Sequence, residues 1–490
     1  MDLINQLAGQ NPFRGDIIPS RVPLIQWGRP TLPFPHPGNY HVPLSILDSI
    51  FHGAEAHEGS ARHNRYMSVP GLPYVLVTRE PAVIKAVLLD TGDQPGEFDR
   101  DPSPMAGIAR ATGGNSLLYA NGTTWHRQKK LAAPPFGRVS LFQPERFAEF
   151  EGTFRKTVAE RLGAFRALQA ATGQRVTRIA LETEIQIVMM EMLVNNFFGA
   201  EIPYEQLRNH YVPATIRLIA YMVSDTVIPR SRNLYKRFGR ARRQFLDDVK
   251  AFEDLTLLAL AGRPDGRGLW GHFKSDAPDD ALKANVRVFL AGAIEATTSM
   301  AGWALSHLSR NEILQEAVYE EVKNVDEYNP DNLRQAKVLN SVLTETLRLT
   351  PSLYFLPRLA TEDRWITLDD GRRFMIPDAT HVVLSVWHAN RCEEFWGREV
   401  SGHPADVFAP ERWEVLVRQG KKLGDLHHFG FGHGPRACPG KYLGMLEVGL
   451  VVGAMVKLFR LRAVTSTQEA TAGVSTKPKD GVLVDLELRG

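Results

Sequence analysis

The stretch FGHGPRACPG at residues 431–440 decides the fold of this chain, because it holds the one cysteine whose surroundings suit thiolate chemistry, Cys438. Its three glycines let the backbone lie close against a flat ligand, where a Cβ atom would intrude. Pro439 suits the first turn of a helix that continues to Val448, and the positive end of that helix favours ionised sulfur over thiol. Ligation of haem iron by the thiolate is the chemistry that such a site suits.

The stretch resembles the haem-binding loop of the cytochrome P450 family, which has phenylalanine, glycine, cysteine and glycine at the spacing of Phe431, Gly434, Cys438 and Gly440. The resemblance implies that Cys438 ligates the iron of haem b and that Phe431, Gly432 and Gly440 lie against the porphyrin. A zinc site built from Cys438 and nearby histidines is disfavoured, because no second cysteine or spaced ligand pair completes a tetrahedral set.

The composition is that of a globular protein: 43% of the 490 residues are hydrophobic and 23% are charged, enough to bury a sizeable core. A formal net charge of +3 points neither to nucleic acid nor to a strongly acidic partner. The two cysteines, Cys392 and Cys438, provide no disulfide framework and fit a reducing compartment. No run of about twenty apolar residues occurs between Met1 and Pro43, so we expect no membrane anchor. A soluble, cytoplasmic protein follows, and peripheral contact with a membrane is compatible with it.

Helical patterns dominate from Thr123 to Leu349, including Arg178–Phe198 and Ala281–Leu308. The preceding stretch, residues 90–122, is rich in Gly, Pro and Asp and reads as a long functional loop. A short helix is predicted at Pro81–Leu89. Strand patterns are predicted at Tyr74–Val77, Trp365–Leu368, Val382–Leu384 and Gly481–Leu488.

This order of elements matches the P450 fold, which is mainly α with small β-sheets. We expect a single large haem domain at residues 74–490, with residues 1–73 as an N-terminal extension packing on it.

Two further motifs resemble haem contacts of the family. Trp125 and Lys129, one helical turn apart, match a tryptophan and a basic residue that face the haem propionates, with lysine in place of the usual arginine. Together with Arg358 and Arg436 they are expected to clamp two carboxylates. The neighbouring charges are either solvated or form a basic patch for an acidic electron donor: Arg127, Lys130 and Lys441.

The segment FLAGAIEATTS at residues 289–299 lies on the helix that in the family crosses the distal face of the haem. Small residues such as Ala291 and Gly292 open a groove beside the iron, although a packed core helix uses small residues equally well. Family members follow the acid with a threonine that helps deliver protons to bound oxygen. Here Ala296 stands at that position, between Glu295 and Thr297.

Because consecutive helical residues point about 100° apart, Thr297 replaces the missing hydroxyl only if the helix bulges. We expect proton delivery through Glu295, Thr297 and water, or through a hydroxyl of the substrate.

Glu345 and Arg348 stand three residues apart on one helical face, a spacing that is uninformative by itself. Their place before Cys438, with Arg412 between them and the cysteine, resembles a buried network of the family, so all three are assigned a structural role. The similar run Pro144–Phe147 lies on the wrong side of the Glu345 helix and reads as an ordinary helix start.

The resemblance implies a haem-thiolate monooxygenase that inserts one atom of O₂ into a small organic substrate. Electrons are expected from a separate ferredoxin, flavodoxin or reductase, because the segment after Cys438 is too short for a reductase. Substrate contacts are expected from residues 90–122 and 199–230, the distal helix and residues 352–356. These side chains predict a mainly apolar pocket, or equally belong to the core: Leu117, Leu118, Ile294, Tyr354, Phe355 and Leu356.

Two alternatives stay open. A P450-like peroxygenase, isomerase or dehydratase needs no external electrons, and the alanine at position 296 in place of the usual threonine favours this class. A non-catalytic haem sensor or carrier is the other.

Overall fold

The computed structural model describes residues 64–67, 74–92, 96–101, 106–113, 115–227, 239–261 and 280–489. The stretch Met1–Pro43 and most of the expected extension 1–73 lie outside these residues. Strand β1 (Asn64–Met67) pairs antiparallel with β2 (Tyr74–Thr78). The main sheet therefore begins before residue 74, the predicted start of the domain.

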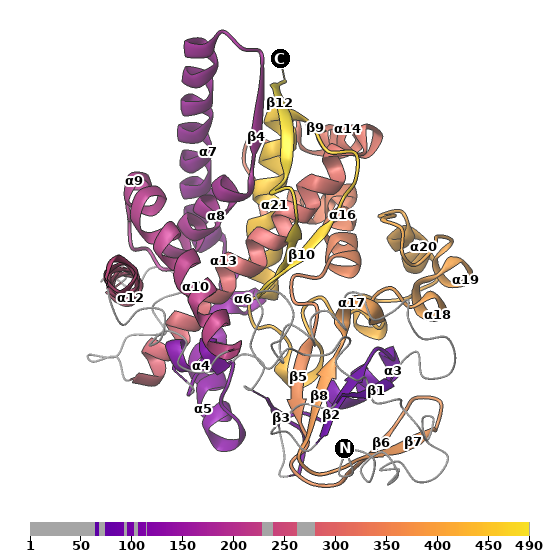
Figure 1. Ribbon diagram of the computed structural model, residues 1–490. Helices are drawn as coiled ribbons and strands as arrows, with labels where there is room; N and C mark the ends of the chain where they lie inside the picture. Colours follow the sequence, from indigo (N-terminus) through magenta and orange to yellow (C-terminus); the bar gives the residue numbers. More distant parts are fainter. Residues whose placement is uncertain are drawn as a thin grey trace.

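Helices form most of the structure, and α13 (Asp280–Ser309) crosses the middle of the helical part (Figure 1). The predicted helices at Pro81–Leu89 and Ala281–Leu308 are confirmed as α3 and α13. The other principal helices are α4 (Ala106–Thr112), α5 (Gly122–Ala132), α7 (Pro144–Thr172), α8 (Glu182–Glu191), α10 (Val212–Val227), α12 (Arg240–Ala261), α14 (Glu312–Val322), α16 (Lys337–Leu349), α20 (Arg412–Arg418) and α21 (Lys441–Leu458).

The strands form small sheets, as predicted. The largest has the order β1-β2-β8-β5-β3, with β2 and β8 (Thr380–Leu384) parallel and the other pairs antiparallel. A second sheet has the order β4-β12-β9. The remaining strands are β3 (Asp99–Arg100), β4 (Val176–Ala180), β5 (Leu356–Leu359), β6 (Arg364–Thr367), β7 (Arg373–Ile376), β9 (Phe459–Ala463), β10 (Ala470–Ala472), β11 (Thr476–Pro478) and β12 (Leu483–Leu488).

Two sequence predictions are wrong in detail. Residues Val176–Ala180 form strand β4 rather than the start of a helix, because they pair with β12, and α8 begins only at Glu182. That helix is continued by a π-helical turn, Met192–Phe197. The expected loop at residues 90–122 contains β3 and α4. The run Pro144–Phe147 does begin a helix, α7, with proline in its first turn.

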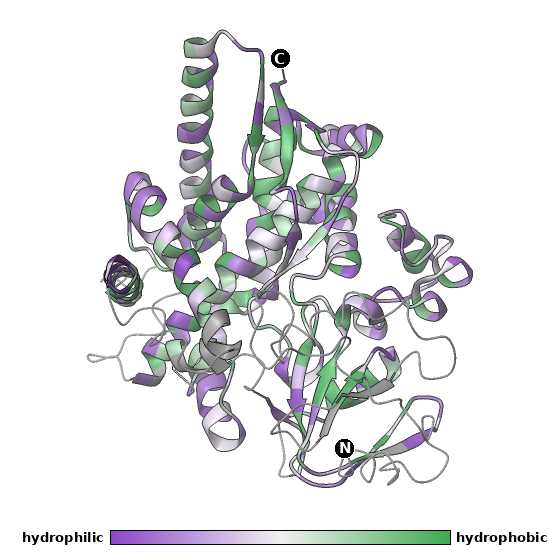
Figure 2. Ribbon diagram, in the orientation of Figure 1, coloured by the Kyte–Doolittle hydropathy of each residue, from purple (hydrophilic) through white to green (hydrophobic). Residues whose placement is uncertain are grey.

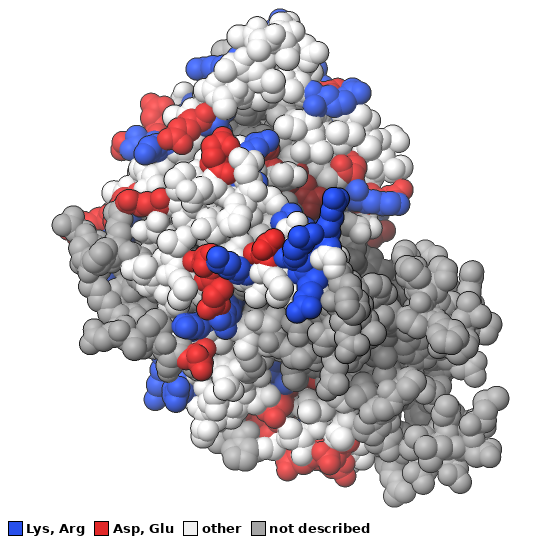
Figure 3. Space-filling view, turned by 60° about the vertical axis from the view of Figure 1, so that its left-hand side comes forward, with Lys and Arg blue, Asp and Glu red and all other residues white. Residues whose placement is uncertain are grey.

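The apolar residues collect in one large core between the helices and a smaller one under the main sheet. In Figure 2, hydrophobic residues are concentrated in α21 and β8, which lie in these cores. Figure 3 shows a face on which basic and acidic side chains are mixed, with one group of Lys and Arg near its centre, in keeping with the small net charge.

One helix within the described ranges, Leu282–Ser309 of α13, has the length and mean hydropathy (1.3) to cross a membrane. However, 67% of its apolar window is buried inside the protein, and the core helix of a globular protein meets the same criteria.

Candidate active site

The backbone around Cys438 folds into a tight loop before α21. The Cys438 N–H donates to the carbonyl oxygen of Phe431 at 2.8 Å, and the Gly432 N–H donates to the Phe429 carbonyl at 2.9 Å. Gly434 has φ +69°, and a Cβ atom there would lie 2.4 Å from the carbonyl oxygen of Leu88. Only glycine fits that position. At Gly440, by contrast, a Cβ would make ordinary contacts, 3.9 Å from the Cys438 sulfur.

The sulfur of Cys438 is exposed, yet burial is the main influence on its acidity and raises the pKa of the thiol. The N–H of Gly440 and the charges of Lys441 and Arg100 act in the opposite direction and are outweighed. The N–H of Gly440, at the start of the helix, favours the thiolate as predicted, although burial outweighs it. The predicted helix start is wrong, because α21 begins at Lys441, beyond Pro439. From this accessible surface on a side chain that protein surrounds, we infer a hollow beside Cys438.

The distal helix α13 carries mostly small residues at the positions that keep accessible surface. The residues that keep accessible surface in its central part recur at helical spacing: Val288, Phe289, Gly292, Ala293 and Ala296. A Cβ atom at Gly292 would meet no atom within 4 Å. Ala291 and Ile294 point elsewhere, being 7% and 1% exposed. The expected contacts of Ala291 with the cofactor and of Ile294 with substrate therefore have no support in their placement.

Phe136 links the distal helix to the cysteine loop. Its ring packs edge-on against Phe289 with centroids 4.9 Å apart, and it lies 3.8 Å from the position of a Cβ on Gly440. Phe136 thus packs against both α13 and the cysteine loop and brings the two into one site.

Buried positive charge lies beside the hollow. Arg358 of β5 is 1% exposed and donates only to Thr91 Oγ1 and the Pro357 carbonyl among the described residues, without an ion pair. Burial lowers the pKa of this guanidinium well below its usual range, and the charges of Arg100 and Arg436 lower it further. Arg358 is buried, whereas Arg100 and Arg436 are half-buried. Three guanidinium groups this close favour anionic ligands, so the residues present fit the two propionates of a haem.

Trp125 and Lys129 differ in burial: Trp125 is buried and Lys129 is exposed. Trp125 is 1% exposed, and the Arg436 guanidinium lies over its ring at 4.1 Å. Arg436 also donates to the Ala120 carbonyl and to Asn121 Oδ1, both at 2.8 Å. Lys129 is exposed, with its ammonium 4.7 Å from the Trp125 ring centroid. The structure therefore brings Trp125, Arg358 and Arg436 together and leaves Lys129 at the surface.

Sequence reasoning missed Arg100. It is the second residue of the two-residue strand β3, which pairs with β5 opposite Arg358, and its Nε donates to the Leu118 carbonyl at 3.1 Å. Burial lowers its pKa, while Tyr119, Asp101 and Cys438 raise it. The sequence does not single it out, because the stretch 90–122 holds two arginines, Arg100 and Arg110, and a strand this short has no periodicity to detect.

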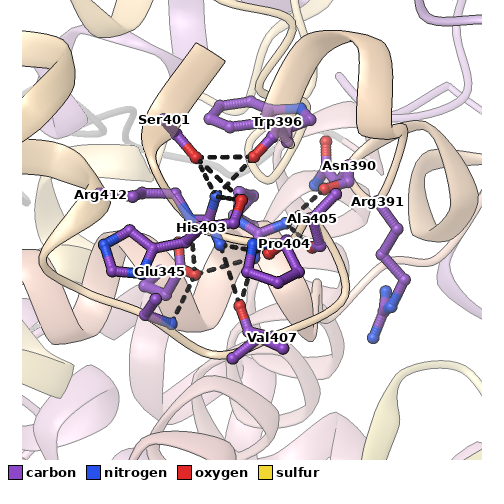
Figure 4. A network of polar contacts seen from close by, with 12 residues as sticks. Glu345, Asn390, Arg391, Trp396, Ser401, His403, Pro404, Ala405, Val407 and Arg412 are labelled. Carbon is purple, nitrogen blue, oxygen red and sulfur yellow. Dashed lines mark hydrogen bonds and ion pairs between the residues drawn. The ribbon is translucent and has the colours of Figure 1, made fainter. Parts of the chain in front are cut away.

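The network of Glu345, Arg348 and Arg412 is formed, and all three side chains are completely buried. Figure 4 shows Glu345 and Arg412 among the residues that surround them. Arg348 donates from Nε and Nη2 to the two carboxylate oxygens at 2.9 and 2.8 Å, and Arg412 Nε donates to Glu345 Oε1 at 2.9 Å. The Ala409 N–H adds a hydrogen bond of 3.0 Å. Burial acts to raise the pKa of Glu345, but the two arginines and this N–H outweigh it, so the pKa is lowered.

Both guanidinium groups also fix surrounding backbone. Arg348 Nη1 donates to the carbonyl of Asn390 at 2.7 Å, and the side chain of Asn390 accepts from the Phe429 N–H at 3.1 Å. Phe429 in turn accepts from Gly432 in the cysteine loop. A continuous path of hydrogen bonds therefore joins the buried network to the loop that carries Cys438.

Around Ala296 the helix is α-helical throughout, without a bulge. The Thr297 hydroxyl donates to the Ala293 carbonyl at 2.6 Å, one turn back, and does not take the direction of residue 296. Ser352 Oγ donates to the Ala296 carbonyl at 2.9 Å. The Glu295 carboxylate accepts from Ser475 Oγ at 2.8 Å and pairs with the Lys477 ammonium at 3.2 Å.

The residues expected to touch substrate differ in burial. Leu117 and Leu118 are half-buried and pack against the main core. Tyr354, Phe355 and Leu356 are 1%, 7% and 7% exposed, and the Tyr354 hydroxyl donates to the Gly473 carbonyl at 3.0 Å. Part of the 199–230 region lies outside the described residues.

Comparison with known proteins decides the family. The cytochrome P450 family model matches residues 60–483. The chain belongs to the cytochrome P450 family. Its P450 relatives include a cytokinin hydroxylase of Arabidopsis thaliana, 27% identical over 76% of this chain and 72% of the relative, and the cytochrome P450 monooxygenase sphH of Aspergillus fumigatus, 24% identical over 86% and 80%.

A crystal structure of a cytochrome P450 (CYP102L1) superposes with a TM-score of 0.70 and 18% identity, covering 92% of this chain and 98% of that one. This likeness confirms the mainly α P450 fold. The protein is accordingly an oxidoreductase of the P450 family, whose members bind haem b.

Proposed function

We propose that this P450 is a monooxygenase that oxidises a mostly apolar small organic molecule, using O₂ and electrons from a separate redox partner. The observation that supports this most directly is that Cys438 and a stripe of small residues on α13 both keep accessible surface, with Phe136 packed against both elements. Relatives named as a hydroxylase and as a monooxygenase support the same reaction class.

Haem b bound in the hollow supplies the activation of O₂, and electron donation by a thiolate favours O–O cleavage. Cys438 would ligate the iron, while Phe431 and Gly432 would lie beside the porphyrin. Trp125, Arg358 and Arg436 would hold the propionates, with Arg100 as an additional contact. The buried Glu345 network would keep the cysteine loop rigid.

The accessible stripe of α13 leaves room for a small molecule and carries no ionisable side chain. Glu295, which is buried beside it, is the one ionisable residue of the described segment 288–296. Glu295 would therefore carry protons as the general acid. Thr297 holds its own helix through Ala293. We expect Ala296→Thr to raise the product formed per electron consumed, and Thr297→Ala to leave it unchanged if protons bypass that hydroxyl.

The redox partner would dock where basic side chains are exposed on α5 and at the start of α21: Arg127, Lys129, Lys130 and Lys441. Opposite charge on such a partner would speed encounter. A soluble, cytoplasmic location remains part of the proposal.

Ala296 keeps a second candidate open, a P450-like peroxygenase, isomerase or dehydratase that needs no external electrons. Turnover with NAD(P)H and surrogate redox partners, compared with turnover on peroxide alone, separates the two. Product only with the electron donors supports the monooxygenase. Product without them supports the second class, and product under neither condition supports a non-catalytic haem protein.

A further inference from the structure

The Glu295 side chain points away from the pocket, toward a lysine that lies nearer the surface. Its carboxylate is 10% exposed and meets Ser475 and Lys477, which belong to the hairpin of β10 and β11 near the end of the chain. Since the hydroxyl of Thr297 is engaged with Ala293, Glu295 is the ionisable group through which this part of α13 can take up protons.

Lys477 shares its ammonium between two carboxylates. Its Nζ lies 3.2 Å from a Glu295 oxygen and 3.2 Å from a Glu182 oxygen. The side chains become more accessible along this line, from 10% at Glu295 through 15% at Lys477 to 33% at Glu182. The three residues come from α13, β11 and α8, so the line joins the distal helix to solvent at the first turn of α8.

The hairpin is fixed in register against α13 by neutral hydrogen bonds. Thr476 donates its N–H to the Ser352 carbonyl at 3.0 Å and its hydroxyl to the Pro351 carbonyl at 2.9 Å. Trp303 Nε1 of α13 donates to the same hydroxyl at 3.1 Å. Ser352 also donates to the Ala296 carbonyl, so the hairpin and the helix turn that lacks a threonine are joined by one network.

We propose that Lys477 is a positioning residue for proton supply: it holds the Glu295 carboxylate at the end of a Glu295–Lys477–Glu182 line that reaches solvent, and thereby compensates for the absent hydroxyl at Ala296. This inference rests on the proposed monooxygenase function. Glu295 takes one proton from water admitted beside Lys477 and Glu182, delivers it on the pocket side, and returns to Lys477 as a carboxylate. One proton moves inward in each cycle, and no electron moves along the line.

The test compares Lys477→Met with Lys479→Met in the haem-loaded protein. Lys479 is a matched control, because it pairs with Glu469 across the same hairpin at 2.6 Å with both side chains about two-thirds exposed. Lys477→Met should lower the product formed per electron consumed about tenfold and raise the solvent deuterium isotope effect on turnover. Lys477→Arg should restore most of the yield, and Lys479→Met should change neither quantity.

A readout that is independent of turnover uses the melting temperature. The shifts caused by Lys477→Met and Glu295→Gln should be non-additive in the double variant, whereas those of Lys479→Met and Glu295→Gln should add. If Lys477→Met does not fold, Ser475→Ala removes one hydrogen bond to the same carboxylate and should change yield and isotope effect in the same direction, to a smaller extent.

The proposal is overturned if Lys477→Met, or Ser475→Ala in its place, matches Lys479→Met in yield and isotope effect. If the wild type itself gives no product with electron donors while it binds haem through a thiolate, the proposed function fails instead, and the additivity of the melting shifts still tests the Glu295–Lys477 contact.

Discussion

Glu345→Gln should destabilise the protein strongly, because Glu345 is the only acidic residue in the described part of the chain that pairs with Arg348 and Arg412. All three side chains are 0% exposed, and three of the hydrogen bonds that Glu345 accepts come from guanidinium nitrogens. Removing one partner of a buried ion pair costs about 3–5 kcal/mol. Backbone carbonyls still surround both guanidinium groups, so we expect about 3 kcal/mol, or about a hundredfold in the folding equilibrium.

The assay is a urea titration of the haem-loaded protein at pH 7, followed by far-UV circular dichroism, with the free energy taken from the midpoint at constant m value. Glu414→Gln is the control, because Glu414 pairs with Arg418 where their side chains are 65% and 77% exposed, and its loss should cost less than about 1 kcal/mol. Equal losses for Glu345→Gln and Glu414→Gln would refute the reasoning.

Three further outcomes are expected. Gly434→Ala should lower the free energy of unfolding by at least about 2 kcal/mol, because residue 434 has φ +69° and the new Cβ would meet the Leu88 carbonyl. Gly424→Ala, with open space around the new Cβ, should be nearly neutral in the same urea titration. Arg358→Met should speed haem loss to apomyoglobin about tenfold, since a charged contact to a propionate disappears; an unchanged rate would place the propionates elsewhere. Burial lowers the pKa of His428 to about 4, so its contribution to stability is complete above the unfolded pKa near 6.5 and declines as the pH falls toward 4. His428→Gln should therefore make the urea midpoint depend less on pH between pH 6.5 and 5. An equal pH dependence in the variant and the wild type would contradict this assignment.

The fold and the loop around Cys438 could be predicted because their signals are local. Glycine, proline and cysteine at fixed spacing define the loop, and the apolar repeat of 281–308 defines α13. Strand β4 could not be predicted, because its pairing with β12 joins residues some three hundred positions apart. Short strands of this kind gain their stability from the partner rather than from their own pattern.

The site was predictable to a lesser degree, because side-chain direction depends on packing. Ile294 and Ala291 share a segment with Gly292 but point into the core. Lys129 has the expected spacing from Trp125 and still remains in solvent. The contact between Lys477 and Glu295 could not be predicted for a similar reason, because no local feature of the hairpin indicates that it meets a helix more than 180 residues earlier in the chain.

The most direct test of the whole account is the carbon monoxide difference spectrum of the reduced, haem-loaded protein, recorded for the wild type and for Cys438→Ser. We predict a thiolate-type shift of the Soret band in the wild type and its loss in the variant, with haem still bound. A thiolate-type shift that persists in Cys438→Ser, or one that is absent from the wild type, would contradict the assignment of Cys438 as the axial ligand.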